Sequence, residues 1–251
     1  MLVEDHREGA VLALTLNDPA RLNVLSSAMI AALQEALLEA QSDTSVRSIL
    51  LTGSGKAFCA GHDLSELKAG EEGSNAEALF SACRDLMLTL PAMPQPVIAL
   101  VHGVATAAGC QLVAACDLAI ATPKAKFGLN GIDVGLFCST PMVAASRAMM
   151  PRTCFELLVS GDFLNAEDAK AAGLINTVVP EDRLLTEGRA LANRIAEKEP
   201  IAIALGKKAF YQQLQAPLEA AYAIGQNAIL ENLSLSATQE KIAAFAAKRK
   251  Q

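Results

Sequence analysis

Two stretches of small residues, each beside an expected strand, are the parts of this sequence best suited to chemistry. They are residues 56–64 (KAFCAGHDL) and 102–112 (HGVATAAGCQL). Glycine and alanine leave backbone amides open to a ligand. The second stretch is expected to enter a helix, whose first amides have no intrahelical acceptor and carry partial positive charge. Two such amides could bind one oxygen that develops negative charge, although close packing explains either stretch alone.

The surrounding pattern predicts the elements that position these stretches. Apolar runs predict strands at 10–16, 46–52, 97–102, 117–121 and 175–179. Helices are expected at 28–41, 76–90 and 166–172, the last capped by Asn165 and stopped by Gly173. A charged segment at 66–74 predicts a loop. Strands alternate with helices to about residue 185, and the rest is helical, so we expect an α/β core over 1–190 and a helical region over 191–251.

The composition restricts the possible partners. Of 251 residues 52% are hydrophobic and 19% charged, the net charge is −6, and there is no tryptophan. These values favour a globular body with an aliphatic core and disfavour a nucleic-acid partner. The six cysteines lack CxxC spacing, so we expect buried thiols in a reducing compartment and no metal site. No apolar run reaches membrane-spanning length and no targeting signal is recognisable, which predicts a soluble cytoplasmic protein without a membrane partner.

The ordered motifs resemble a known family. Residues 58–64 (FCAGHDL) resemble the FxAGxDL segment of the crotonase (enoyl-CoA hydratase/isomerase) superfamily. Residues 102–112 with Cys116-Asp117 resemble its NGxAxGGGxEL…CD loop, and residues 127–128, 166–180 and 245–250 also fit. The stretches 107–111 and 135–141 point to one poorly defined branch. The resemblance implies an α/β spiral of repeated ββα units with a C-terminal helical trimerisation region.

The resemblance also implies a ligand and residue roles. It implies an acyl-CoA thioester as substrate or ligand, no further cofactor, and a homotrimer or dimer of trimers. The backbone N–H groups of His62 and Ala108 would form the oxyanion hole. The residues expected to contact the CoA thioester are Arg21, Leu22, Ala60, His62, Asp63, Leu64, Ala108, Phe245 and Lys248. Phe245 and Lys248 would reach the CoA of a neighbouring subunit; alternatively, residues 248–250 are a solvated basic tail.

The sequence departs from the family where proton transfer takes place. Family hydratases use two glutamates, and Gln111 and Gly131 occupy those positions here. Neither residue can act as a general acid or base, although Gln111 could orient a water. A dienoyl-CoA isomerase would have an aspartate in place of Ser139.

The candidates to replace the missing glutamates are weak. Asp133 lies near in sequence, but it is more simply a structural hydrogen-bond acceptor. The His62 imidazole has a suitable unperturbed pKa, and Asp63 fits a turn-stabilising role better than a base. A thiolate at Cys110 or Cys138 would need an activating base, and none is evident.

The sequence therefore predicts an acyl-CoA-binding protein of hydratase/isomerase type that stabilises a thioester enolate and hydrates weakly. One alternative is a thioesterase or decarboxylase on the same scaffold. The other is an acyl-CoA-binding protein without catalytic activity.

Overall fold

A computed structural model describes the backbone of residues 1–67 and 76–248, and side chains as far as residue 247. Its strands are β1 (Val3–Glu8), β2 (Val11–Leu16), β3 (Ser48–Gly53), β4 (Ala57–Cys59), β5 (Val97–Val101), β6 (Val104–Thr106), β7 (Leu118–Ala121), β8 (Lys126–Gly128), β9 (Phe163–Asn165) and β10 (Thr177–Val178). Its helices are α1 (Ser27–Ser42), α2 (Ala76–Ala92), α3 (Ala108–Ala115), α4 (Pro141–Ala148), α5 (Pro151–Ser160), α6 (Ala166–Ala172), α7 (Leu184–Ala196), α8 (Pro200–Gln213), α9 (Leu218–Leu233) and α10 (Ser236–Lys248). Short 3-10 turns are η1 (Pro19–Arg21), η2 (Leu64–Leu67), η3 (Asn130–Val134) and η4 (Glu181–Arg183).

The strands form two sheets, and from β3 to β8 consecutive strands alternate between them. The larger sheet has the order β1-β2-β3-β5-β7-β10 and the smaller has β4-β6-β8-β9. Thus β3, β5 and β7 enter the large sheet, while β4, β6 and β8 follow each of them into the small sheet. The pairs within β3-β5-β7 and within β4-β6-β8 are parallel. This is the expected spiral of ββα units on an α/β scaffold.

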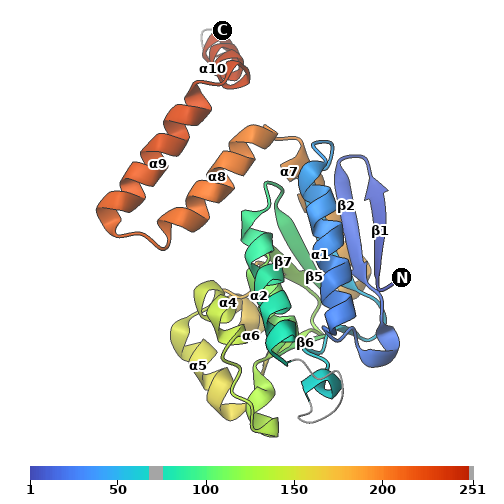
Figure 1. Cartoon of the computed structure of the whole chain (residues 1–251). Helices are drawn as coiled ribbons and strands as arrows, with labels where there is room; N and C mark the ends of the chain where they lie inside the picture. Colours follow the sequence, from blue (N-terminus) through green and yellow to red (C-terminus); the bar gives the residue numbers. More distant parts are fainter. Residues whose placement is uncertain (68–75, 249–251) are drawn as a thin grey trace. The chain divides into compact units, whose positions relative to one another are not determined.

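Alternation along the central strands buries both faces of the large sheet. Ile49 and Leu51 of β3 join the core that includes α1 and α2, whereas Leu50 joins a second cluster with Leu184 and Ala192 of α7. The strand period of two therefore sends neighbouring side chains to opposite helical layers. In Figure 1, α1 and α7 accordingly lie on opposite faces of the sheet.

Several expected elements are confirmed with small shifts. The Ser26 hydroxyl accepts a hydrogen bond from the Met29 amide at 3.2 Å and caps α1. Asn165 caps α6 in the same way, and Gly173 ends it in the left-handed conformation. The expected loop at 66–74 lies mostly outside the described residues. No helix in the described ranges is long and apolar enough to cross a membrane.

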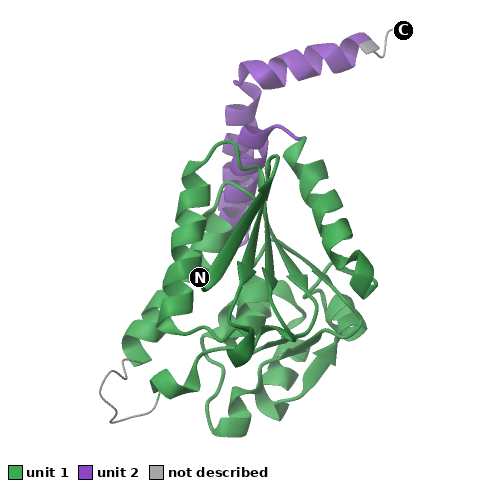
Figure 2. Cartoon of the chain, turned by 90° about the vertical axis from the view of Figure 1, so that its right-hand side faces the viewer, with its two compact units in different colours: residues 1–197 green, residues 198–251 purple. Residues whose placement is uncertain are grey.

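The chain divides into two compact units, residues 1–197 and 198–251 (Figure 2). The division falls after Glu197 rather than after residue 190, because Leu184 and Ala192 anchor α7 on the large sheet. Unit 2 consists of α8, α9 and α10, which expose large apolar side chains including Phe210, Leu218, Tyr222 and Phe245.

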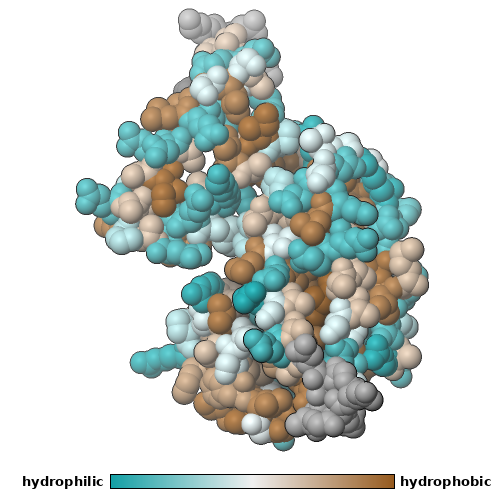
Figure 3. Space-filling model, viewed as in Figure 1, coloured by the Kyte–Doolittle hydropathy of each residue, from teal (hydrophilic) through white to brown (hydrophobic). Residues whose placement is uncertain are grey.

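Unit 1 also exposes apolar side chains. They lie on η3, α4 and α5, where Val134, Phe155 and Val159 are each about half exposed or more. The corresponding lower part of Figure 3 is brown over these elements.

Candidate functional site

The two small-residue stretches meet in the structure. A Cβ atom placed on Gly61 would lie 3.4 Å from the amide nitrogen of Ala108 and 3.1 Å from the Cβ of Ala107. The Gly61 φ of +90° also favours glycine. The backbone before His62 therefore lies directly against the start of α3.

A second glycine lets α3 approach β4. A Cβ atom on Gly109 would overlap the Cys59 carbonyl oxygen and lie 2.8 Å from its carbonyl carbon. Because these are buried backbone atoms, the position cannot accept a side chain without moving the helix or the strand. Glycine is thus required here by close packing.

Two amides in this region lie where the regular structure supplies no acceptor. Ala108 is the first residue of α3, so its N–H has no intrahelical acceptor. His62 forms a parallel bridge with Leu25, but that bridge uses the Gly61 carbonyl and the Asp63 amide. Neither the His62 nor the Ala108 amide has an acceptor among the described residues. Two adjacent unpaired amides could bind a single oxygen carrying negative charge.

The residue before Ala108 has an unusual backbone. Ala107 has φ 49° and ψ −117°, a region that residues with a Cβ atom rarely occupy. Its own amide donates to the Gly128 carbonyl at 2.9 Å, which fixes the entry to α3. Such strain persists only where surrounding contacts enforce it, and it orients the following Ala108 N–H.

A loop of residues 18–25 supports the first stretch. The Ala60 amide donates to the Leu22 carbonyl at 3.0 Å, and the Leu25 amide donates to the Gly61 carbonyl at 2.7 Å. Leu22 and Asn23 both have left-handed backbones, with φ of 56° and 55°. Asn23 is fully buried. Its importance was not recognised from the sequence, although an asparagine after Asp18-Pro19 is a turn signal.

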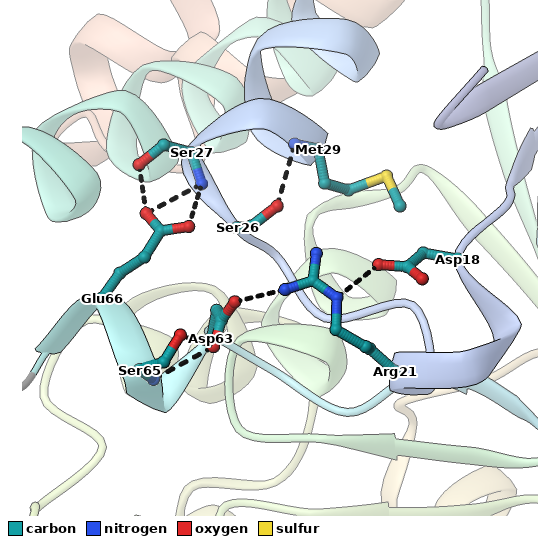
Figure 4. A network of polar contacts seen from close by, with 8 residues as sticks. All are labelled: Asp18, Arg21, Ser26, Ser27, Met29, Asp63, Ser65 and Glu66. Carbon is teal, nitrogen blue, oxygen red and sulfur yellow. Dashed lines mark hydrogen bonds and ion pairs between the residues drawn. The ribbon is translucent and has the colours of Figure 1, made fainter.

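A polar network covers the outside of this loop (Figure 4). Arg21 contacts the carboxylates of Asp18 at 2.8 Å and Asp63 at 2.6 Å. The Ser65 hydroxyl and amide donate to Asp63, and Glu66 accepts from the Ser27 amide at 3.1 Å. The network thus ties the segment after His62 to the Arg21 loop and to the start of α1.

The network limits the chemistry of Arg21 and Asp63. Hydrogen bonds from Ser65, together with Arg21, lower the pKa of Asp63 below its ordinary value. An ionised, already paired carboxylate is a poor base, so Asp63 fits the turn-stabilising role. The hydrogen bond and charge of Asp18 raise the pKa of Arg21, whose exposed guanidinium is already shared by two carboxylates.

Gln111 lies one turn into α3 and is 4% exposed. Its Oε1 atom is buried and has no hydrogen-bond partner within the described parts of the chain. A buried amide oxygen without a partner is unfavourable, so it is suited to accept from a group that a ligand or water brings. It remains unable to exchange a proton.

Gly131 cannot be replaced by a glutamate in this backbone. A Cβ atom here would overlap the Leu136 carbonyl oxygen and lie 2.8 Å from Cys138 Sγ. The turn is closed by the Leu136 amide, which donates to the Gly131 carbonyl at 2.9 Å, and by the Gly131 amide, which donates to Cys138 Sγ at 3.3 Å. Thus the turn itself occupies the space that a side chain would need.

Asp133 is exposed and lies against the end of α5. Its Oδ2 atom would be 3.2 Å from a Cβ atom on Gly161, the residue that ends α5. Asp133 is therefore placed beside a helix C-terminus, and no described contact links it to His62 or Ala108.

The His62 imidazole is unsuited to act as an acid. Burial lowers its pKa to about 4, so it is neutral at neutral pH. The ring packs edge-on against Phe80 of α2, with centroids 5.1 Å apart, and its buried Nε2 atom has no described hydrogen-bond partner. The contact with Phe80 could not be foreseen from the sequence, because it joins two separate elements of the fold.

The thiols are inert in this arrangement. All six cysteines are free and buried. Burial raises the pKa of Cys110 to about 12 and also raises that of Cys138. Both groups are therefore protonated thiols rather than nucleophiles. In the described part of the chain no group of histidine, cysteine or acidic residues could hold a metal ion.

The remaining expected contact residues occupy different places. Leu22 and Leu64 are exposed, at 44% and 55%, and Ala60 is half-buried. Phe245 is 64% exposed on α10, in unit 2. Lys248 ends α10, and its side chain lies outside the described part of the structure.

A polar pair that the sequence analysis missed precedes the second stretch. The Thr106 hydroxyl, at the end of β6, donates to Asn130 Oδ1 at the start of η3. This bond connects the entry to α3 with the turn that contains Gly131. Neither group titrates near neutral pH, so the pair orients backbone rather than transferring protons.

Comparisons with known proteins agree with this architecture. The profile of the Enoyl-CoA hydratase/isomerase family matches residues 6–251. Enoyl-CoA hydratase domain-containing protein 3, mitochondrial, from Rattus norvegicus is 39% identical over 249 residues, covering 99% of this chain and 83% of the rat protein. It represents the branch that residues 107–111 and 135–141 indicate. The 2,3-dehydroadipyl-CoA hydratase of Escherichia coli is 34% identical, covering 97% of this chain and 94% of that protein.

Solved structures give the same result. The crystal structure of an enoyl-CoA hydratase from Mycobacterium smegmatis is 48% identical with a TM-score of 0.95, over 99% of this chain and 97% of that chain. That of human enoyl Coenzyme A hydratase domain-containing protein 3 is 38% identical with a TM-score of 0.95, over 99% and 98%. The resemblance inferred from the motifs is confirmed, and the chain belongs to the enoyl-CoA hydratase/isomerase family of the crotonase superfamily.

Proposed function

We propose that this protein binds an acyl-CoA thioester and polarises its carbonyl between the N–H groups of His62 and Ala108. The observation that supports this most directly is the contact of the two segments: a Cβ atom added to Gly61 would lie 3.4 Å from the Ala108 nitrogen. Both amides lack described acceptors, so the carbonyl oxygen would receive two hydrogen bonds. No cofactor beyond the CoA thioester is required.

The same two bonds would stabilise a thioester enolate. As negative charge moves to the carbonyl oxygen, each N–H donor becomes worth more, on the order of 10²–10³ in rate. The backbone supplies these donors, so they do not depend on the replaced side chains. The activity is thus hydratase/isomerase-type chemistry at the acyl carbons next to the thioester carbonyl.

Hydration itself is expected to be weak. Positioned acids and bases are commonly worth about 10²–10⁴ each, and Gln111 and Gly131 supply neither. The low pKa of His62, about 4, makes its imidazole a weak base, and Asp133 lies beside α5. We therefore expect hydration of crotonyl-CoA far below that of a family member with both glutamates.

Acyl-CoA binding without turnover is the second candidate function. It is favoured by the Gly131 turn, which leaves no room for a carboxylate, and by the protonated thiols near it. A panel of acyl-CoA thioesters would separate the candidates. Binding with no conversion favours this reading, whereas release of free CoA or CO₂ indicates the thioesterase or decarboxylase alternative.

Titration calorimetry tests the proposed binding. Short- and medium-chain acyl-CoAs should bind more tightly than the corresponding free acids. Lys248→Ala should weaken binding and reduce its dependence on salt, because an exposed ammonium–phosphate contact is screened by ions. Absence of heat with every thioester would contradict the proposal.

The proposed assembly is a homotrimer or a dimer of trimers. Exposed apolar residues on α8, α9 and α10, such as Leu218 and Tyr222 at 75% exposure each, need a protein surface to cover them. Phe245 and Lys248 would then contact the CoA of a neighbouring subunit. A cytoplasmic location remains a prediction, since the mammalian relative is named as mitochondrial.

A further inference from the structure

Asn23 is the most completely bonded buried polar side chain near the proposed oxyanion hole. It is 0% exposed, and its Nδ2 lies 2.8 Å from the Ser54 carbonyl, 2.9 Å from that of Ala57 and 3.2 Å from that of Phe58. Its Oδ1 accepts from the Asp18 amide at 2.9 Å. One side chain therefore connects the Arg21 loop with the turn before β4 and with β4 itself.

The same loop also holds the backbone on both sides of His62. Before His62, the Leu25 amide donates to the Gly61 carbonyl at 2.7 Å. After it, the Asp63 amide donates to the Leu25 carbonyl at 3.4 Å. The loop thus fixes two successive peptide groups, and the His62 N–H belongs to the first of them.

The loop depends on an unfavourable backbone conformation that the Asn23 side chain stabilises. Leu22 and Asn23 are consecutive left-handed residues, and this turns the Leu22 carbonyl to the Ala60 amide at 3.0 Å. For a residue such as leucine the left-handed conformation costs roughly 1–2 kcal/mol. The four hydrogen bonds of the Asn23 amide offset that cost and keep the loop in place.

We propose that Asn23 is a positioning residue that sets the direction of the His62 N–H and so determines how strongly this protein polarises a thioester carbonyl. The inference rests on the proposed function, because it concerns the same oxyanion hole. Asn23 does not touch the ligand; it acts through residues 57–62 and through the loop that holds Gly61 and Asp63.

The test compares two ligands that differ only at the carbonyl. An acyl-CoA thioester has the oxygen that the hole would bind, and the S-alkyl-CoA thioether has a methylene in its place. For wild-type protein the ratio of the two Kd values measures the hydrogen bonds to the carbonyl. Asn23→Gly removes the side chain and keeps a residue that tolerates the left-handed backbone.

We expect Asn23→Gly to lose about threefold to tenfold in affinity for the thioester, the net worth of one hydrogen bond. Affinity for the thioether should not change, so the ratio falls. Isotope-edited infrared spectra of the bound thioester should show its C=O stretch returning toward the frequency in solution. If Asn23 had only a structural role, its replacement would lower the affinities for thioester and thioether together.

Asn17→Ala is the matched control. Asn17 accepts from the Ser54 hydroxyl at 3.0 Å and donates to Glu4 at 2.6 Å, near the same turn, and no described hydrogen bond joins its side chain to residues 57–62. It should leave the ratio and the C=O frequency at their wild-type values. If Asn23→Gly does not fold, Asn23→Ser, which has a shorter reach to the three carbonyls, should show a smaller change of the same sign.

The outcomes separate this inference from the proposed function. Wild-type protein that binds thioester and thioether equally would contradict the oxyanion hole itself. Wild-type preference for the thioester that persists in Asn23→Gly, or in Asn23→Ser if that variant is the one that folds, would overturn the role of Asn23 alone. Equal loss for both ligands would also overturn it, because Asn23 would then support only the fold.

Discussion

Restoring a glutamate at position 131 should damage this protein rather than make it a hydratase. The Gly131→Glu change puts a Cβ atom onto the Leu136 carbonyl oxygen and within 2.8 Å of Cys138 Sγ. The first neighbour is backbone, so no rotation of a side chain relieves the overlap. The turn must open, and the bond from the Leu136 amide to the Gly131 carbonyl must lengthen or break.

The magnitude follows from these contacts. Overpacking costs about 1–3 kcal/mol, and a lost hydrogen bond costs roughly 0.5–1.5 kcal/mol more. Together they predict a loss of about 1.5–4.5 kcal/mol in the free energy of unfolding. For a protein of this size that lowers Tm by roughly 3–18 °C. The damage arises at Cβ, so Gly131→Ala should show most of it.

Thermal unfolding by circular dichroism measures the first effect, and crotonyl-CoA absorbance measures hydration. Gly135→Ala is the control: its Cβ meets nothing within 4 Å, and only the positive φ of 77° opposes it. We expect a loss of about 1 kcal/mol there. A Gly131→Ala variant with the wild-type Tm would refute the steric reasoning, as would fast hydration by Gly131→Glu.

Three further predictions concern packing, pH and assembly. Gly109→Ala should lower Tm and weaken thioester binding, because the added methyl group pushes α3 away from Cys59. Gly206→Ala, on α8, meets no atom within 4 Å and should raise the free energy of unfolding by about 0.5–1 kcal/mol. Thermal unfolding measures the stability of both variants, and titration calorimetry measures their binding. Burial lowers the pKa of His62 in the folded protein from 6.5 to about 4. The contribution of neutral His62 to the free energy of unfolding is therefore complete above about pH 6.5 and is lost as the pH falls toward about 4. Urea unfolding therefore tests the shift. Between about pH 7 and about pH 5 the free energy of unfolding should fall less in His62→Gln than in the wild type, and an equal fall in both proteins would contradict the shift. Light scattering at micromolar concentration should give a trimer or hexamer mass, and a monomer mass would exclude the proposed assembly.

The sequence predicted the fold well where local signals were strong. Ser26, Asn165 and Gly173 begin or end their helices as expected, because caps act through neighbours in the chain. The strand β1 was missed because all its side chains after Val3 are polar and exposed. The strands β4, β6, β8 and β9 were also missed: each has only three residues, too few for a periodic signal. Their pairing partners also lie far away in sequence, so the second sheet is not visible from composition.

The contact between the two small-residue segments was predicted from the sequence, but the packing around them was not. The motif match brought residues 58–64 and 102–112 together, and the structure puts Gly61 beside Ala108. The obstruction at Gly131 depends on Leu136 and Cys138, and the low pKa of His62 depends on its burial in the folded protein. These are contacts between segments, which a single sequence without an alignment does not specify. Roles for Ala108 and His62 in binding remain predictions.

The six buried thiols can report transient opening of the structure around them. Cys59 lies at the end of β4 and Cys110 in α3, so the two elements behind the candidate hole each contain one sulfhydryl screened from solvent. A reagent in water can modify these groups only during transient opening of the surrounding structure. Their relative reaction rates would therefore distinguish local separation of β4 from α3 from unfolding of the whole domain.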